Sequence, residues 1–434
     1  MGHSDFDVIV IGGGPAGLMA CVGALRQHAR VLLLEKGEKL GRKLIISGGG
    51  RCNVTNNKDI DEMVRQIPGN GRYMYTAFHQ FGPKDIIKFF EGLGVALKEE
   101  DNGRMFPVTD KATTVAETLI RHIRDHGAAI RLQAGVERLV FEDGAIKGVV
   151  LQGGERLTSH AVVIAVGGMS VPKTGSTGDG YPWARAVGHT ITDLFPTEVP
   201  VTSNTPWIKD GSLMGLALRG VDLVLLDGKG KKLTTQHGDM LFTHFGVSGP
   251  AGLRLGHYVS VARRKKPGEL LRLEIDMLPA KNVDEIYQET YQMTAEEPKK
   301  AVKNVLKGYV PERLVPLLLG LAEVPEDTTH AHIPKAKWQA LARLMKHLPV
   351  SITGTLSIEE AFVTGGGVHT KEVDPKTMGS KLVPGLFFAG EVLDVHAHTG
   401  GYNITIAFSS GHVAGTSAAK WVKALQAAPR GPEG

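Results

Sequence analysis

Three glycines near the N-terminus, Gly12, Gly14 and Gly17, have the spacing of a turn that binds the phosphates of a dinucleotide. The short β-branched run Asp7–Ile11 precedes them and is typical of a strand buried on both faces, and Leu18–Gln27 follows as a helix. In such a turn the first glycine makes the bend, the second lets the pyrophosphate approach and the third lets the helix pack closely. The helix N-terminus adds N–H groups and a favourable dipole. The spacing therefore predicts a dinucleotide site.

An acidic residue, Glu35, closes the next apolar run, Val31–Leu34, and lies eighteen residues after Gly17. A carboxylate at this place hydrogen-bonds a ribose hydroxyl and repels a 2′-phosphate. We therefore expect NAD or FAD at this site rather than a 2′-phosphorylated nucleotide.

A second glycine-rich segment, Ser47–Asn56, contains three consecutive glycines, Gly48–Gly50. Without Cβ atoms, this backbone can approach a flat or charged group and donate N–H groups to it. Three basic residues, Arg42, Lys43 and Arg51, flank the glycines. We expect the chain to run along a large anionic cofactor here.

Two later segments favour FAD over NAD. One fully apolar run ends in Ala165–Gly168, and Leu386–Glu391 lies near the C-terminus. Both are similar to segments of flavoproteins of the glutathione-reductase type, in which a late strand followed by glycine and an acidic residue returns to the ribityl chain and pyrophosphate of the flavin. Gly390 and Glu391 fit that place.

Five segments that occur in order along the chain support a closer resemblance. They are Gly41–Asn53, Leu241–Pro250, Thr364–Val368, Gly390–Asp394 and Thr399–Asn403. Together they resemble the HI0933-like flavoproteins, also called the BaiN or aminoacetone-oxidase type. The resemblance implies FAD, a Rossmann-type FAD-binding domain, an inserted β-barrel and a helical domain.

The chain departs from the usual pattern of that family at a few positions. Val166 stands where relatives often have Thr, and Glu391 stands where many flavoproteins of the glutathione-reductase type have Asp. His396 and His398 lie in a variable stretch that the resemblance places near the flavin. The histidines therefore bear on the choice of substrate.

The distribution of strands and helices predicts an α/β fold with insertions. Buried apolar runs alternate with helices at first; alternating segments between Gly and Asp turns follow, and then helical stretches punctuated by proline. We expect a Rossmann-type FAD-binding domain of the glutathione-reductase type with an inserted antiparallel β-barrel-like domain and a small helical domain. The expected boundaries are 1–196 and 349–434 for the two parts of the FAD-binding domain, 197–280 for the β insertion and 281–348 for the helical domain.

The residues expected to bind the cofactor lie in the glycine-rich turns and at the strand ends beside them. They are Gly12, Gly14, Pro15, Ala16, Gly17, Glu35, Lys36, Arg42, Lys43, Ser47, Gly48, Gly49, Gly50, Arg51, Asn53, Val136, Gly167, Gly168, Gly390, Glu391, Gly400, Gly401, Tyr402 and Asn403. Asn403 is also expected to cap the final helix, which would aim helix N–H groups at the pyrimidine end of the flavin.

Because a flavin performs hydride transfer itself, the protein must supply orientation, electrostatics and a proton. Cys52 is one candidate donor, because Arg51 and the N–H groups of the turn would lower the pKa of its thiol. The alternative is a small buried residue against the flavin ring. His396 and His398 are the other candidates, since imidazole titrates near neutral pH. With only Asp394 nearby they make a poor zinc motif, so no metal is expected.

Composition limits the compartment and the partners. Two cysteines cannot form a disulfide framework, and the polar first residues contain no signal core, so we expect a cytoplasmic protein. No apolar run approaches the roughly 18 residues of a membrane span. Three basic clusters, at 229–232, 263–266 and 299–307, contribute to the net charge of +5. They are typical either of solvated surface or of contacts with a phosphate-rich partner.

Three functions remain open. The first is an FAD-dependent oxidoreductase that reduces an unsaturated substrate with NADH or NADPH, which would bind transiently because no second Gly-x-Gly-x-x-Gly follows a strand. The resemblance extends to flavoproteins implicated in reducing a uridine of large-subunit ribosomal RNA to dihydrouridine, and the basic charge favours RNA. The second is action on a small lipophilic or amino-ketone molecule. The third is a flavin-binding scaffold or redox sensor without turnover.

Overall fold

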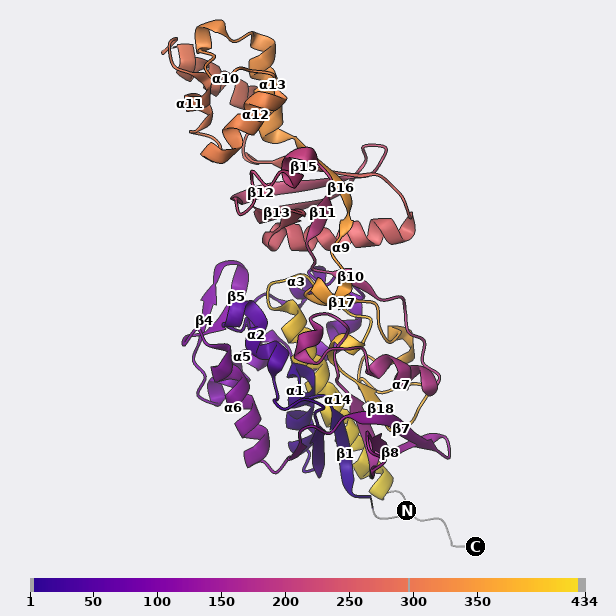
Figure 1. Ribbon diagram of the computed structural model, residues 1–434. Coiled ribbons are helices and arrows are strands. Elements are labelled where there is room, and N and C mark those ends of the chain that lie inside the picture. The colour runs from indigo at the N-terminus through magenta and orange to yellow at the C-terminus, as the bar shows by residue number, and fades with distance from the viewer. Residues whose placement is uncertain (1–3, 296, 428–434) are drawn as a thin grey trace, which may run out of the picture. The chain divides into compact units, whose positions relative to one another are not determined.

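The computed structural model describes residues 4–295 and 297–427, which form two compact units. Unit 1 runs up to Phe195 and resumes at Val363, and unit 2 is Pro196–Phe362. The chain passes between them in two short strands, β10 (Phe195–Thr197) and β17 (Val363–Gly365) (Figure 1). Among the helices of the described residues, none combines the length and the apolarity needed to cross a bilayer.

A mixed sheet of seven strands forms the centre of unit 1, in the order β6-β2-β1-β9-β8-β7 with β18 pairing β9. Five strands run parallel: β1 (Phe6–Ile11), β2 (Val31–Leu34), β6 (Ala129–Arg131), β9 (Arg156–Ile164) and β18 (Leu386–Phe388). The antiparallel extension is β7 (Val136–Glu142) and β8 (Ala145–Leu151). Val8, Ile9 and Val10 are fully buried, as expected of a parallel strand covered on both faces.

Two helices from opposite ends of the chain, α1 (Pro15–Leu25) and α14 (Tyr402–Ala427), pack closely against each other. A Cβ on Gly23, Gly411 or Gly415 would overlap backbone atoms of the facing helix, so these glycines set the close approach. The remaining α-helices described in unit 1 are α2 (Arg42–Gly50), α3 (Ile60–Arg65), α4 (Tyr75–Gln80), α5 (Pro83–Gly92), α6 (Ala112–Asp125) and α7 (Gly180–Ala186). A small antiparallel sheet contains β3 (Thr55–Asn56), β5 (Arg104–Pro107) and β4 (Leu97–Glu100), in that order.

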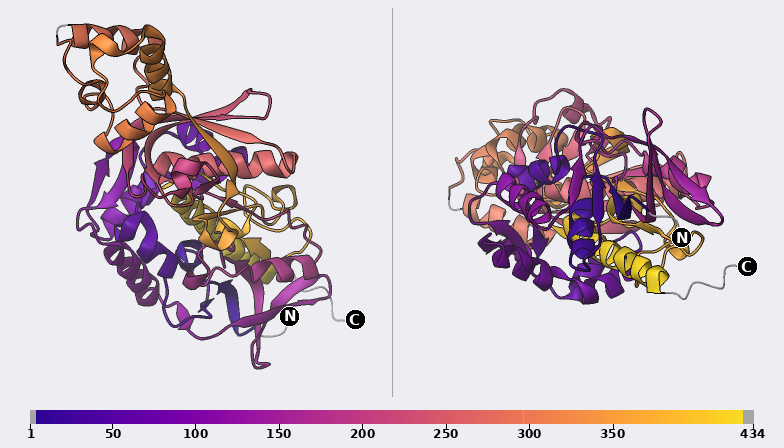
Figure 2. Two further views of the ribbon diagram at one scale, coloured as in Figure 1. Left: turned by 45° about the horizontal axis from the view of Figure 1, so that its top comes forward. Right: turned by 90° about the horizontal axis from the view of Figure 1, so that it is seen from below.

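Unit 2 contains a closed barrel of six antiparallel strands, with α9 (Gly249–Lys265) packed along it (Figure 2). In barrel order the strands are β11 (Val201–Ser203), β14 (Gly246–Ser248), β13 (Lys232–Phe242), β12 (Ala217–Leu226), β15 (Leu271–Asp276) and β16 (Leu348–Thr355). The barrel confirms the predicted fold class. The expected boundary at 348/349 falls at the start of β16, which closes the barrel between β15 and β11.

Helices complete unit 2 and share one hydrophobic core with the barrel. They are α8 (Pro206–Lys209), α10 (Val283–Ala295), α11 (Val302–Leu306), α12 (Val315–Leu321) and α13 (Lys335–Lys346). Trp338 of α13 is fully buried in this core. At the end of α13, Lys346 forms an ion pair with Asp276 of β15, with 2.5 Å between Nζ and Oδ2. The barrel and the helices therefore form one compact unit.

Candidate functional site

Several of the predicted cofactor residues gather at one edge of the seven-stranded sheet. Ile11 pairs with Leu34 and Ile164, and Phe388 also pairs with Ile164. The carboxyl ends of these parallel strands therefore meet at one edge, which is where open α/β sheets bind ligands. The segments that follow these strand ends carry Gly12, Glu35, Gly167, Gly168, Gly390 and Glu391.

The turn after β1 requires two of its glycines for folding and leaves the third open. Gly12 has φ +104°, and a Cβ on it would lie 2.6 Å from the carbonyl oxygen of Ala165. A Cβ on Gly17 would overlap the carbonyl oxygen of Gly12. A Cβ on Gly14 would have no atom within 4 Å. The backbone at Gly14 thus faces open space at the start of α1.

The start of α1 suits an anion. Gly14 is its N-cap and provides no side-chain hydrogen bond, and Pro15 occupies the first turn. The first N–H groups of a helix have no partner within the helix, and its dipole favours negative charge there. Gly390 lies beside this turn with φ +76°, and a Cβ on it would come within 2.8 Å of Ala16 Cβ. Small residues therefore border the place expected for a pyrophosphate.

Glu35 lies at the end of β2, with its carboxylate held by the backbone. Oε2 accepts a hydrogen bond from Gly13 N at 2.8 Å, and Oε1 accepts one from Gly37 N at 2.7 Å. Glu35, Lys36, Val136 and the 12–14 turn line the same cavity. Lys36 forms an ion pair with Asp179, with 2.5 Å between Nζ and Oδ2. The cavity thus joins the predicted ribose and phosphate sites.

The three consecutive glycines form an open stretch of left-handed backbone. The helical turn of α2 breaks at Ser47, and Gly48, Gly49 and Gly50 have φ of +57°, +68° and +83°. A Cβ on Gly49 or Gly50 would have no atom within 4 Å, whereas one on Gly48 would lie 2.8 Å from Asn53 N. The segment therefore presents backbone without side chains, as a closely approaching cofactor requires.

The three basic side chains near these glycines point to different partners. Arg42 donates to the carbonyl oxygen of Lys173 at 2.6 Å. Arg51 pairs with Glu100 and with Asp110, and its guanidinium carbon lies 4.2 Å from the centroid of the Phe106 ring. These contacts hold Arg51 against the small β3-β5-β4 sheet.

Lys43 instead belongs to a polar network around Glu391. Its ammonium lies 2.7 Å from Glu391 Oε2 and 2.8 Å from Ser170 Oγ. Glu391 Oε1 accepts from Ser170 Oγ at 2.7 Å and from Thr364 N at 2.8 Å. Burial raises the pKa of Glu391, but the charge and hydrogen bond of Lys43, with the bonds from Ser170 and Thr364, outweigh it and keep this pKa below its usual range. The carboxylate therefore stays ionised.

Gly167 and Gly168 allow this network to form after β9. Gly167 has φ +77°, and a Cβ on it would lie 2.9 Å from Ser176 Oγ. A Cβ on Gly168 would overlap Thr364 Oγ1 and would lie 3.1 Å from Glu391 Oε1. Ser170 and Thr364 are site residues that were not predicted from the sequence. Thr364 opens one of the glycine-rich family segments, which was a usable signal, whereas nothing in the local sequence marks Ser170.

The expected lowering of the thiol pKa of Cys52 is wrong. Cys52 has φ +61° and is fully buried in the hydrophobic core of unit 1. Burial raises the pKa of its thiol to about 12, although a hydrogen bond with Ser47 acts in the opposite direction. Arg51, which was expected to favour the thiolate, is engaged by Glu100 and Asp110. Cys52 is thus a neutral thiol.

Asn53 is a buried polar side chain whose oxygen has no hydrogen-bond partner among the described residues. A Cβ on Gly401, which has φ +92°, would lie 2.9 Å from Asn53 Oδ1 and 2.8 Å from the carbonyl oxygen of Thr55. Gly400 has φ +134° and packs under the ring of the buried Tyr402. Since buried polar atoms normally have partners, Asn53 Oδ1 is an acceptor suited to a ligand donor.

The two histidines are buried, and His396 and His398 are 4% and 6% exposed. The backbone of His396 exchanges hydrogen bonds with Gly69, and His398 N donates to Gln66 O at 3.0 Å. Nothing in the sequence pattern predicted that the segment 66–69 would meet this loop. Packing against the ring of Phe195 further fixes His396, with 5.4 Å between ring centroids.

Asn403 stabilises this histidine loop from α14, and the expectation that it caps the helix is wrong. Its Oδ1 accepts from Ala397 N at 2.9 Å, and its Nδ2 donates to the carbonyl oxygens of Ala397 and His398 at 2.7 and 3.3 Å. Asn403 lies inside the first turn of α14, which begins at Tyr402. Its side chain is therefore used by the loop 397–398.

The donors and acceptors of unit 1 fit FAD. The open backbone at Gly14, Gly49 and Gly50 leaves room for a cofactor, and the free N–H groups of α1 suit a pyrophosphate. The orphaned oxygen of Asn53 provides an acceptor for a polar ring edge. Within residues 4–295 and 297–427, no group of three or more His, Cys, Asp or Glu side chains could hold a metal ion.

Comparison with known families identifies the chain. The family model for the HI0933-like protein Rossmann domain matches residues 6–417. The chain belongs to this family. Like other members of the HI0933-like family, it is an FAD-dependent oxidoreductase.

Two curated relatives are similar over nearly their whole length. The 3-dehydro-bile acid delta(4,6)-reductase of Clostridium scindens is 30% identical over 416 residues, which cover 95% of this chain and 98% of that protein. The ribosomal RNA dihydrouridine synthase of Escherichia coli is 33% identical over 406 residues, which cover 93% and 96%.

A solved structure, 3-ketosteroid delta1-dehydrogenase from Sterolibacterium denitrificans in complex with 1,4-androstadiene-3,17-dione, shares the fold of this HI0933-like chain. Its TM-score is 0.51 at 13% identity, covering 96% of this chain and 99% of that one.

Proposed function

We propose that this chain reduces the carbon–carbon double bond of a uridine in large-subunit ribosomal RNA, with NADH or NADPH as the reductant. The main support is the full-length similarity, at 33% identity, to a protein named ribosomal RNA dihydrouridine synthase. The name of the bile-acid reductase describes related chemistry, because each substrate has a double bond conjugated with a carbonyl group. The common reaction is thus the reduction of an unsaturated carbonyl compound.

The reaction adds a hydride and a proton across the double bond. In the uracil ring the hydride goes to C6, which is β to the C4 carbonyl, and the proton goes to C5, while NADH or NADPH becomes NAD⁺ or NADP⁺. FAD, when bound, supplies the hydride chemistry between donor and substrate. The chain must therefore hold the cofactor, orient the uracil and provide the proton.

The polar residues of unit 1 would divide the work of cofactor binding. The N-terminus of α1 would hold the pyrophosphate, and Glu35 would accept from the ribose. The open backbone at Gly49 and Gly50 would lie along the cofactor, with Asn53 Oδ1 as an acceptor. The Lys43–Glu391 pair would place a fixed cation and a fixed carboxylate beside it.

Cys52 is our candidate proton donor. Burial raises the pKa of its thiol to about 12, so the thiol carries its proton at neutral pH and is a weak acid rather than a nucleophile. His396 and His398 are the second candidates, held by the backbone contacts to Gln66 and Gly69. Replacing Cys52 by Ala should leave reduction of the flavin by NADH or NADPH intact and abolish substrate reduction. Equal turnover in Cys52→Ala would remove this residue from the mechanism and leave the histidines.

The decisive experiment is nucleoside analysis of large-subunit ribosomal RNA from a strain that lacks this chain. We expect one dihydrouridine to be lost and to return when the chain is supplied again. An unchanged dihydrouridine content would refute the RNA substrate. Anaerobic mixing of the FAD-loaded protein with NADH or NADPH tests turnover separately, because a non-catalytic flavin scaffold would show no loss of flavin absorbance.

A small unsaturated ketone is the second candidate substrate. The similarity to the Clostridium scindens reductase, which covers 98% of that protein, favours it. Turnover of a 3-oxo-4-ene steroid acid by the purified chain, with no action on ribosomal RNA, would support this alternative.

A further inference from the structure

Two basic clusters that are separate in the sequence meet at one end of the barrel. Leu226, at the end of β12, pairs with Lys232 of β13 on one side and with Arg272 of β15 on the other. The turn 227–231 and the segment 266–270 therefore leave the barrel at the same end. A Cβ on Gly228 would lie 3.3 Å from the carbonyl oxygen of Leu270.

The turn 227–231 is held in place by its own acidic residue. The carboxylate of Asp227 accepts from the N–H groups of Lys229 and Lys231, each at 2.9 Å. These bonds lower the pKa of Asp227, and the charge of Lys266 contributes in the same direction. The lysine side chains of the turn thus project from an ordered backbone while its carboxylate is already engaged.

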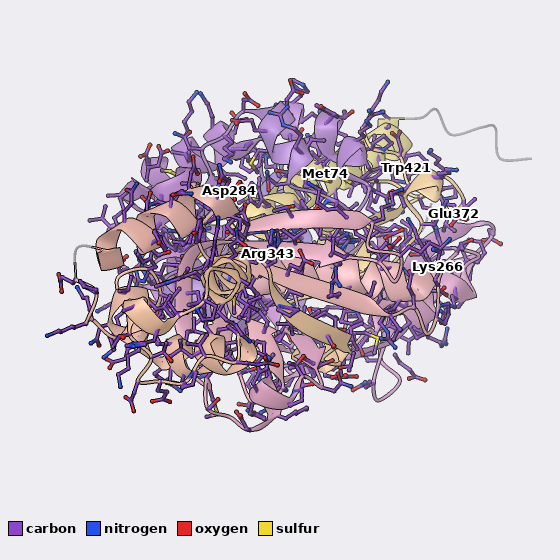
Figure 3. All side chains as sticks on the ribbon, turned by 90° about the horizontal axis from the view of Figure 1, so that it is seen from above. Met74, Lys266, Asp284, Arg343, Glu372 and Trp421 are labelled. Atoms are coloured by element: carbon purple, nitrogen blue, oxygen red, sulfur yellow. The ribbon has the colours of Figure 1, made fainter. Side chains whose placement is uncertain are left out.

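Positive charge is concentrated at this end of unit 2. Seven basic residues lie here, and we call them the basic end of the barrel: Lys229, Lys231, Lys232, Arg263, Arg264, Lys265 and Lys266. The segments 227–232 and 263–269 contain these seven basic residues and two acidic ones, an excess equal to the net charge of +5 of the whole chain. Six of the seven are exposed, and Figure 3 shows Lys266 at the periphery.

Four lysines of the basic end have no ion pair among the described residues, in contrast to most lysines of the third basic cluster. Across the described part of the chain, Lys229, Lys231, Lys232 and Lys265 make no ion pair. In the helical part of unit 2, three lysines of the cluster 299–307 are paired with acidic neighbours. These pairs are Lys300–Glu297, Lys303–Asp327 and Lys307–Glu312. Four lysines at the barrel end are therefore available to bind an anionic partner, whereas three lysines of the cluster 299–307 are already neutralised by acidic neighbours.

We propose that the basic end of the barrel is a docking surface for the phosphate backbone of the RNA substrate; this rests on the proposed function. Exposed lysines that neutralise phosphates release the counterions condensed on a nucleic acid, and this release drives association. The ordered turn and the C-terminal end of α9 bring these charges to the same end of the barrel.

The nonpolar residues at this end argue against a membrane as the occupant. Ala251, Leu255 and Val259 of α9 are fully buried in the core of unit 2. Leu270 and Leu233, which are 80% and 39% exposed, are isolated side chains on two segments. A membrane-binding helix needs a continuous apolar face in addition to its charges. The surface therefore fits RNA better than an anionic bilayer.

The test compares two variants that lose the same charge. The barrel-end variant carries Lys229→Gln, Lys231→Gln, Lys232→Gln and Lys265→Gln. The matched control carries Lys299→Gln, Lys300→Gln, Lys303→Gln and Lys307→Gln. Each FAD-loaded full-length protein is titrated with unmodified large-subunit ribosomal RNA made by transcription in vitro, over a range of salt concentrations. The flavin absorbance spectrum checks that each variant is folded.

The barrel-end variant should bind this RNA about 10-fold more weakly or worse, and the slope of log Kd against log salt should fall by about 3, because each lost phosphate contact contributes about 0.7. The control should bind like the parent, and four Lys→Arg changes at the barrel-end positions should retain binding. Parent-like binding by the barrel-end variant would overturn the proposal. The proposal would also be overturned if the parent bound phosphatidylglycerol vesicles more strongly than RNA and the barrel-end variant lost this vesicle binding.

Dihydrouridine formation, measured in the same samples, separates this proposal from the proposed function. If the barrel-end variant loses RNA binding and the parent forms no dihydrouridine, the docking surface is supported and only the proposed reaction is refuted. Dihydrouridine formation by the parent together with parent-like RNA binding by the barrel-end variant would refute the surface alone.

Discussion

Breaking the Lys43–Glu391 ion pair should destabilise unit 1 by more than the loss of an exposed pair. Both side chains are about one fifth exposed, at 22% and 20%. Glu391→Gln removes the carboxylate and leaves the Lys43 ammonium partly buried without its counterion. Ser170 and Thr364 lose a charged acceptor as well.

The expected magnitude lies between two known limits. Removing one partner of a fully buried pair costs about 3–5 kcal/mol, whereas exposed pairs contribute about 0–1 kcal/mol. For this degree of exposure we expect the free energy of unfolding to fall by about 2 kcal/mol. At about 2–4 °C per kcal/mol for a domain of this size, the Tm of unit 1 should fall by about 4–8 °C.

The assay is a double-mutant cycle on FAD-free protein, because bound FAD would add its own stabilisation. Urea unfolding of the parent, Lys43→Met, Glu391→Gln and the double variant gives the coupling free energy, which we expect to exceed about 1 kcal/mol. Arg131 and Glu155 form a matched exposed pair, with side chains 41% and 52% exposed. A coupling no larger than that of Arg131→Met with Glu155→Gln would refute the reasoning.

The pH dependence of stability provides a second readout of the same pair. The pKa of Glu391 in the folded chain is below its usual value, which is about 4.3 in an unfolded chain. Its contribution to stability is therefore fully present above about pH 4.3 and is lost as the pH falls through the folded pKa. Glu391→Gln should lose less stability than the parent over this range.

Three further predictions concern other parts of unit 1. Gly17→Ala should lower the free energy of unfolding by about 3 kcal/mol, because its Cβ would overlap the carbonyl oxygen of Gly12. Gly14→Ala should fold normally and bind FAD more weakly, as measured by fluorescence titration. Equal stability of the two variants would contradict this prediction. Cys52 should resist iodoacetamide at pH 8 in the native protein and react after unfolding, since burial keeps its thiol protonated; rapid native labelling would show that the thiol is accessible. Asn403→Ala should cost about 1–3 kcal/mol and speed hydrogen exchange of the Ala397 amide, which loses its acceptor; unchanged exchange would show that the loop is held without it.

Local sequence was sufficient for the backbone of the cofactor region. The spacing of the glycines at 12, 14 and 17 predicted a strand–turn–helix unit, and the turn has that form in the structure. The fold itself requires Gly12 and Gly17, whereas Gly14 leaves open space. The change to alternating apolar residues after residue 197 indicated antiparallel strands, which close into the barrel. Periodicity could not show that β16 returns to this barrel after the helices, because strand pairing is a long-range property.

The sequence determined a dinucleotide site and an α/β fold with insertions, because these follow from glycine spacing and from the period of apolar residues. The choice of FAD rested on the resemblance of later segments to flavoproteins. Tertiary structure decided the electrostatics. Cys52 stands beside Arg51 in the sequence, but burial sets the pKa of its thiol while Arg51 turns to Glu100 and Asp110. Lys43 and Glu391 are 348 residues apart yet form one ion pair. The electrostatic environment of a residue depends on its exposure to solvent and on charged neighbours from distant segments of the chain. The spacing of residues along the sequence predicts neither of these.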